Sequence, residues 1–210
     1  MNAQEKLKEI IKRLKKEYPE LKTALTFSNP FELLVATVLS AQTTDVHVNK
    51  VTGNLFKKYK SIKDYAHVPL ETLQKDVNSI NFYKTKAKNI HESGKMIIEH
   101  FNSKVPRTME ELITLPGVAR KTANIILSSA YGINEGIAVD THVKRLSNRL
   151  GMTKNEDPVK IEKDLMEITP QSEWGNLSHL LIFHGRKICQ AKKPNHKECV
   201  LFDICPSRNI

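Results

Sequence analysis

The chain has 210 residues, 40% of them hydrophobic and 27% charged, a composition that is ordinary for a folded protein and argues against disorder. Its net charge of +10 and isoelectric point near 9.4 favour a polyanionic partner, since clustered Lys and Arg release counterions from phosphates, although solubility alone is an alternative. No apolar run reaches the roughly 20 residues of a membrane span and no secretory segment begins the chain, so we expect a cytoplasmic protein without a membrane partner.

The first half of the chain predicts a series of helices. Residues 5–18 carry apolar side chains on one face and lysines on the other. Asn29, Pro30 and Glu32 form a start signal for a helix that is apolar on all sides and ends near residues 40–42. We expect Asp45 to cap the next helix, followed by a short helix over 70–77 and a longer one over 83–101.

The second half continues the helical pattern. Thr108 and Glu111 form a capping box, and Asp140 is placed to cap a helix that Gly151 ends. Asp157 and Pro158 open another helix, and a last one, over about 174–188, leads to Cys189. No alternating strand pattern appears, so we predict an all-α fold.

The segment "LPGVARKTANIILSSAYG", residues 115–132, predicts a helix-hairpin-helix turn. Such a turn aims successive backbone N–H groups away from a helix start and can hold phosphate; an ordinary helix corner is the alternative. Its backbone would come from Gly117, Val118, Ala119 and Arg120. Lys121 lies just inside the helix, where a cation is locally unfavourable, and local misfits concentrate at working sites.

Four motifs together resemble the endonuclease III branch of helix-hairpin-helix DNA glycosylases: "PFELLVATVLSAQTTDVHVNK", "LPGVARKTAN", "VDTHVKRLSNRL" and "HGRKIC". The likeness runs from about residue 25 to Cys205 in the family's order. It implies two helical domains flanking a DNA-binding cleft. Residues 23–133 would form a six-helix domain with the hairpin at about 111–131, and residues 1–22 with 134–210 would form a domain carrying a metal-cluster loop at 189–205.

The resemblance implies that Lys121 is the nucleophile and that Asp140 assists it. The positive end of the helix and the neighbouring Arg120 both disfavour an ammonium at Lys121, which suits a residue that must attack as a neutral amine. A carboxylate held by helix N–H groups stays ionised and can stabilise positive charge on a deoxyribose. The alternatives are that Lys121 only contacts phosphate and that Asp140 is only an N-cap.

The implied activity is that of a bifunctional DNA glycosylase and AP lyase. It would remove oxidised pyrimidines from double-stranded DNA and nick abasic sites through a lysine Schiff base, acting as a monomer located with its DNA. Gln42 and Phe82 match the positions that fill the gap left by a flipped nucleotide. Phe82 replaces the usual leucine, Asn81 a frequent glycine and Ala119 the second hairpin glycine, and Phe82 could instead belong to the core.

The three cysteines all lie within the last 22 residues, which fits a metal site better than disulfides. The family binds a [4Fe-4S] cluster through C-x6-C-x2-C-x5-C, whereas this chain has Cys189, His196, Cys199 and Cys205, with histidine in the second position. We expect a cluster with three cysteine ligands and one histidine ligand; zinc, or a cluster that leaves His196 unbound, are the alternatives. Beside these ligands, Lys192 and Lys193 are candidates for phosphate contacts or are a solvated charge run.

Three other functions are open. The adenine-mismatch branch resembles this chain but carries a glutamate where Thr37 falls and usually lacks the hairpin lysine. The thymine-mismatch branch typically has a tyrosine at the position of Lys121. A non-catalytic DNA-binding module would need neither Lys121 nor Asp140, and the presence of both favours the enzyme.

Overall fold

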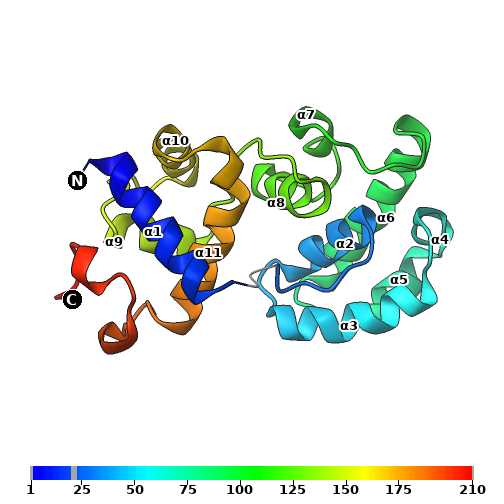
Figure 1. Cartoon of the computed structure of the whole chain (residues 1–210). Helices are drawn as coiled ribbons and strands as arrows, with labels where there is room; N and C mark the ends of the chain where they lie inside the picture. The colour runs from blue at the N-terminus through cyan, green and yellow to red at the C-terminus, as the bar shows by residue number, and fades with distance from the viewer. Residues whose placement is uncertain (1, 20–22, 210) are drawn as a thin grey trace. The chain divides into compact units, whose positions relative to one another are not determined.

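The computed structural model describes residues 2–19 and 23–209 (Figure 1). In these residues the regular structure is helical and there is no strand, which confirms the all-α prediction. The chain divides into two compact units, each with its own hydrophobic core. We call Thr23–Ile133 the hairpin unit, and Met1–Lys22 with Asn134–Ile210 the cluster-loop unit. No helix in the described ranges combines the length and apolarity needed to cross a bilayer.

The hairpin unit is built around a buried helix, α2. This helix packs against α3, α6 and α8, and its Leu33, Leu34 and Leu39 are fully buried, as its all-round apolar sequence requires. The helices of the unit are α2 (Pro30–Ser40), α3 (Asp45–Lys58), α4 (Ile62–His67), α5 (Leu70–Asp76), α6 (Tyr83–His100), α7 (Met109–Leu112) and α8 (Arg120–Tyr131).

Short-range caps fix the ends of these helices. Asn29 accepts a hydrogen bond from the Glu32 N–H at 2.9 Å, but the Glu32 carboxylate turns back to the Ser28 N–H, so the predicted signal is a cap without a reciprocal box. The expectation that Asp45 caps α3 is wrong. Thr44 is the cap, because its hydroxyl reaches the third helical N–H while Asp45 lies in the first turn.

The cluster-loop unit packs α1 against α10 and α11. Leu7, Ile10 and Leu14 of α1 are fully buried, which matches the apolar face predicted for residues 5–18. The helices are α1 (Ala3–Glu17), α9 (Thr141–Arg149), α10 (Pro158–Ile168) and α11 (Trp174–Lys187), with single 3-10 turns η1 (Gln171–Glu173), η2 (His196–Glu198) and η3 (Phe202–Ile204).

Candidate active site and cluster loop

The hairpin turn joins α7 to α8 and depends on Gly117. This residue has φ of 77°, in the left-handed region that only glycine enters at little cost. A Cβ built on it would lie 2.6 Å from Nδ2 of Asn89 on α6, so the position also lacks room for a side chain. The hydroxyl of Ser93, one turn further along α6, donates to the Pro116 carbonyl at 3.1 Å. Contacts with α6 therefore fix the backbone of the turn and leave no room for a side chain at Gly117.

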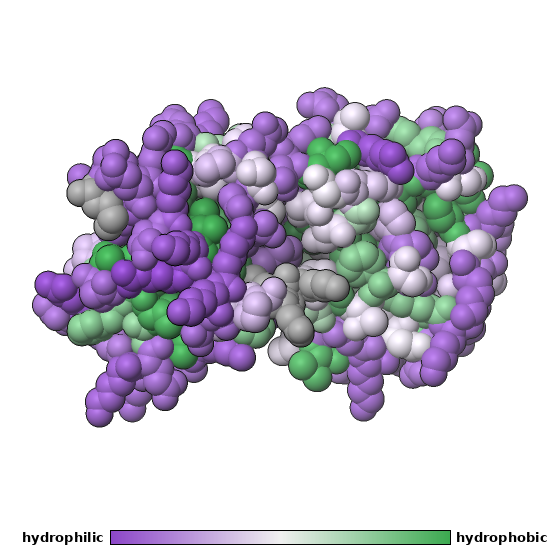
Figure 2. All heavy atoms as spheres, viewed as in Figure 1, coloured by the Kyte–Doolittle hydropathy of each residue, from purple (hydrophilic) through white to green (hydrophobic). Residues whose placement is uncertain are grey.

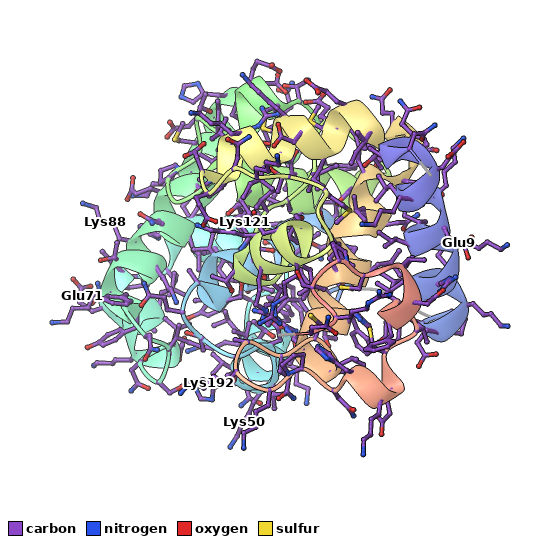
Figure 3. The ribbon with its side chains drawn as sticks, turned by 90° about the vertical axis from the view of Figure 1, so that its left-hand side faces the viewer. Glu9, Lys50, Glu71, Lys88, Lys121 and Lys192 are labelled. Carbon is purple, nitrogen blue, oxygen red and sulfur yellow. The ribbon has the colours of Figure 1, made fainter. Side chains whose placement is uncertain are left out.

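Lys121 is the second residue of α8 and its side chain is exposed (Figure 3). The N-cap is Ala119, with φ of −90° and ψ of 170°, so the alanine that replaces glycine takes an extended conformation without strain. Its side chain has no group that can bond to the first N–H groups of the helix. The lysine amine thus extends from a helix start that keeps its positive end.

Asp140 is the N-cap of α9. Its Oδ1 accepts hydrogen bonds from the backbone N–H groups of His142 and Val143, both at 2.8 Å, and the residue is half-buried. Hydrogen bonds from N–H donors favour the ionised carboxyl group and fix its orientation. Asp140 is therefore an N-cap through Oδ1. This role is compatible with a chemical role for its second oxygen, Oδ2.

Gln42 and Phe82 lie on two loops of the hairpin unit that are tied together. The side-chain amide of Asn81, which precedes Phe82, donates to the Gln42 carbonyl at 2.6 Å. Both Gln42 and Phe82 have positive φ, at 55° and 59°, and both are exposed. Phe82 is 65% exposed, so the alternative that it belongs to the core is wrong.

Lys86 was missed by sequence reasoning, although it supports this pair of loops. It is 6% exposed, and its ammonium donates to the carbonyls of Leu39 and Ala41 and weakly to the Thr43 hydroxyl. The cation lies at the C-terminal end of α2, where the helix dipole stabilises it. Burial lowers the pKa of Lys86. Its place four residues before Ile90, on the apolar face of α6, is the signal that could have marked it.

The predicted cluster ligands come together around one small pocket in the cluster-loop unit. Cys189, His196, Cys199 and Cys205 all line it, and the three cysteines are unpaired. Helix α9 holds the loop in place: Arg149 donates to the Cys189 sulfur at 3.3 Å and to the carbonyls of Gln190 and Ala191 at 2.7 and 2.8 Å. A second arginine of α9, Arg145, bonds to the carbonyls of Gly185 and Cys189 at 2.9 and 3.0 Å.

The four predicted ligands share this pocket but are not gathered around a single point. Within residues 2–19 and 23–209, no three His, Cys, Asp or Glu side chains form a group that could hold one metal ion.

Two further observations concern the surroundings of this pocket. The Cys199 sulfur lies 3.5 Å from Nε2 of buried His184, whose other ring nitrogen bonds to the Tyr18 hydroxyl at 3.0 Å. Burial lowers the pKa of His184 to about 4, so this ring is neutral. Lys192 and Lys193 are exposed on the loop, where Figure 3 labels Lys192.

Comparison with known proteins identifies the family. Residues 35–171 match the family described as HhH-GPD superfamily base excision DNA repair protein. The chain is 51% identical to Endonuclease III of Synechocystis over 95% of this chain and 91% of that protein, and 38% identical to Endonuclease III of Escherichia coli K12 over 98% and 96%. The chain belongs to the endonuclease III family. As a member it is an enzyme of base excision repair, a DNA glycosylase and AP lyase that acts on DNA.

Solved structures agree with this assignment. The chain matches a trapped Endonuclease III–DNA covalent intermediate with a TM-score of 0.92 and 44% identity, covering 99% of this chain and 98% of the other. A non-covalent Endonuclease III–DNA complex gives the same TM-score and identity, covering 99% and 97%. A thermostable thymine-DNA glycosylase shares the fold, with a TM-score of 0.85, at 22% identity.

Proposed function

We propose that Lys121 is the nucleophile of this glycosylase and AP lyase and that Asp140 is the carboxylate that assists it. The observation that carries the proposal is the exposed amine in the first turn of α8, directly after the Gly117 turn, in a chain of this family. A relative at 44% identity has been trapped as a covalent intermediate with DNA, which supports a nucleophilic side chain.

The proposed reaction has two stages. The neutral amine of Lys121 forms a bond to C1′ of the deoxyribose as the glycosidic bond breaks, and the damaged base leaves with the electron pair and takes up a proton. The sugar ring then opens to a Schiff base between C1′ and the lysine nitrogen. Transfer of a proton from C2′ to water breaks the C3′–O bond, which releases the 3′ phosphate and nicks the strand. Water then hydrolyses the Schiff base, which frees Lys121 and leaves an unsaturated aldehyde. Oδ2 of Asp140 stabilises the positive charge that develops on the sugar and accepts the proton from Lys121.

We propose oxidised pyrimidines as the damaged bases, as the family resemblance implies. Thr37 supports this against the adenine-mismatch reading, in which a glutamate stands at this position. Thr37 is 6% exposed, and its hydroxyl donates to the Leu33 carbonyl of its own helix at 2.7 Å. The hydroxyl proton of Thr37 is therefore already donated within α2, and the residue has no carboxylate.

The DNA contacts are proposed on the same basis. Gln42 and Phe82 would fill the space of the extruded nucleotide, since both are exposed on loops that Asn81 ties together. Backbone N–H groups from Gly117 to Arg120 would bind a phosphate of the DNA, and Lys192 and Lys193 another. We propose that the enzyme acts as a monomer, in the cytoplasm with its DNA.

We also propose that Cys189, His196, Cys199 and Cys205 hold a [4Fe-4S] cluster. The support is the spacing of the four donors along the chain, their common pocket and the hydrogen bond from Arg149 to the Cys189 sulfur. When bound, the cluster would tie the C-terminal chain to Cys189, which follows the end of α11, and would fix the loop that carries Lys192 and Lys193.

Borohydride trapping tests the catalytic proposal. The wild-type protein is expected to crosslink to duplexes that carry thymine glycol or an abasic site, and Lys121→Gln to lose the crosslink while still retarding the duplex. Lys12→Gln, an exposed lysine of α1, is the matched control and should crosslink normally. Asp140→Asn keeps one acceptor for the cap and should trap more slowly. Undiminished crosslinking by Lys121→Gln would overturn the assignment.

A further inference from the structure

A second cavity opens in the hairpin unit, away from the residues proposed for catalysis and DNA contact. It has a volume of about 770 Å³ and lies between the start of α2, the start of α4 and residues 103–107. This size falls within the range of small-molecule sites in proteins. None of the residues predicted for catalysis or DNA contact lines it.

Helix α8 separates this cavity from Lys121. Tyr131, the last residue of α8, lines the cavity, whereas Lys121 is the second residue of the same helix. Ten residues of helix correspond to about 15 Å. An occupant of the cavity therefore does not compete for the amine of Lys121.

Aromatic rings form the wall of the cavity. Tyr65 lies between two of them, with ring centroids 5.2 Å from Phe31 and 5.0 Å from Tyr59, and Tyr131 adds a fourth ring. Tyr65 is 1% exposed, and its hydroxyl oxygen is buried without a hydrogen-bond partner in the described residues. A wall of this kind suits a planar aromatic ligand with polar edge atoms, and one that reaches the Tyr65 hydroxyl would satisfy it.

Cations surround the opening. Four of the lining residues are basic and exposed: Lys60, Lys63, Lys104 and Arg107. No salt bridge recorded among the described residues involves any of them. The Arg107 guanidinium lies 4.8 Å from the ring centroid of Tyr131, so charge and aromatic surface adjoin.

Glu32 is the acidic residue that lines the cavity, and its recorded side-chain partner is the neutral Ser28. One of its oxygens, Oε2, accepts from both the N–H and the hydroxyl of Ser28 at 2.7 Å. Four cationic side chains and one carboxylate leave the cavity lining with a net positive charge, which favours an anionic ligand. Figure 2 shows hydrophobic residues at the surface over α4 and the end of α6, with hydrophilic residues around them.

We propose that this cavity binds a nucleoside phosphate, with the base against the aromatic wall of Phe31, Tyr65 and Tyr131 and the phosphate at Lys104 and Arg107. An apolar ligand would leave the cations unused, and inorganic phosphate would leave the rings unused. A nucleoside phosphate uses both, because a planar base carries polar edges and the phosphate accepts charge-assisted hydrogen bonds from guanidinium and ammonium groups.

Titration of the full-length protein with AMP tests the proposal, with adenosine and inorganic phosphate as the two half-ligands. Calorimetry gives the affinities, and amide chemical shifts locate the site. We expect saturable AMP binding that shifts the amides of residues 103–105, 107 and 131, and at least tenfold weaker binding of either half-ligand. The amide of Lys121 should not shift.

Two substitutions at the opening supply the matched comparison. Lys104→Gln combined with Arg107→Gln is expected to weaken AMP binding at least tenfold with only a small drop in the melting temperature, because both side chains are exposed and, among the described residues, Arg107 loses only its contact with the Tyr131 ring. Lys57→Gln, on the exposed side of α3 and outside the cavity, should leave AMP binding unchanged. A short single-stranded oligonucleotide distinguishes the source of the ligand: tighter binding than AMP at the same amides assigns the site to a DNA strand, and weaker binding assigns it to a free nucleotide.

Several results would overturn the proposal. These are a lack of saturation at about 10 mM AMP, shifts confined to residues outside the cavity, equal affinity for AMP and for either half-ligand, or an equal loss of binding in Lys57→Gln.

Discussion

The side-chain nitrogen of Lys86 lies 2.8 Å from the carbonyl oxygen of Leu39, at the end of the helix that leads to Gln42. This contact joins α6 to the turn after α2, and the Asn81 amide makes a second bond to the same turn. The buried Lys86 thus helps to fix the backbone of the turn that carries the exposed Gln42.

Lys86→Met is expected to lower the free energy of unfolding by about 1–3 kcal/mol, because the carbonyls of Leu39 and Ala41 lose their donor. The turn with Gln42 would loosen, so excision from a paired duplex should fall more than nicking at an abasic site, where no base must be extruded. Chemical denaturation and the ratio of the two activities measure these effects. Lys88→Met, an exposed lysine on the same helix, is the control and should change neither (Figure 3).

The sequence is informative about Asn29, Asp140 and Asp157 because an N-cap bonds to N–H groups two or three residues away. Such a signal is local and survives without knowledge of the tertiary fold. The prediction that Asp45 caps α3 failed although the signal is local, because Thr44 is the cap. Both residues are good caps, and the position of the helix start by one residue decides between them.

The residues that hold the candidate site in place were harder to predict from the sequence. Lys86 contacts residues more than 40 positions earlier, and Arg149 holds Cys189 40 positions later, so neither role has a short-range pattern. The helix at Ile62–His67 was also not predicted, since six residues are too few for a periodic signal. Motif spacing identified the candidate nucleophile and cluster ligands, whereas packing alone identifies the residues that orient them.

Gly117→Ala should destabilise the hairpin for two reasons: alanine resists the positive φ, and its methyl group meets Asn89. We expect a loss of about 2 kcal/mol or more in the free energy of unfolding, together with weaker DNA binding. Gly132→Ala separates the two causes, since Gly132 has φ of 68° but no atom within 4 Å of the added Cβ. Gly132→Ala should lower the free energy of unfolding by only about 1–2 kcal/mol.

Trimming Asn89 gives a second check on this explanation. In an Asn89→Ala background, the Gly117→Ala substitution should cost less than in the wild type, because the contacts of the new methyl group with Nδ2 at 2.6 Å and Cγ at 3.1 Å are removed and only that with the Cβ at 3.1 Å remains. An equal cost in both backgrounds would assign the effect to the backbone conformation alone.

His196→Cys tests the ligand set of the C-terminal loop. The purified wild-type protein is expected to be brown, to absorb near 400 nm and to contain about four iron atoms per chain. His196→Cys should retain the absorption and lower the reduction potential, because a thiolate replaces a neutral imidazole. His196→Ala should lose iron faster under chelation, whereas His100→Cys, which adds a thiol at an exposed position, should behave as the wild type. A colourless protein with one zinc ion would contradict the proposed cluster.

The hydrogen bonds of Asp164 should make the stability of the protein depend on pH. Its Oδ2 accepts hydrogen bonds from the Thr153 hydroxyl and from the Asn155 amide, the latter at 2.7 Å, and these bonds lower the pKa of Asp164 below its ordinary value of 3.8. The unfolded chain therefore takes up the proton first as pH falls. The stabilisation is complete above the ordinary value and is lost as pH falls through the lowered one.

Asp164→Asn should accordingly lower the free energy of unfolding at pH 7, and the difference from the wild type should shrink as pH falls below about 4. Glu167→Gln, an exposed carboxyl on the same helix, is the control and should leave the stability nearly unchanged at pH 7. Urea denaturation at several pH values measures all three proteins. A difference between Asp164→Asn and the wild type that stays constant down to pH 3 would show that the hydrogen bonds of Asp164 do not depend on its charge.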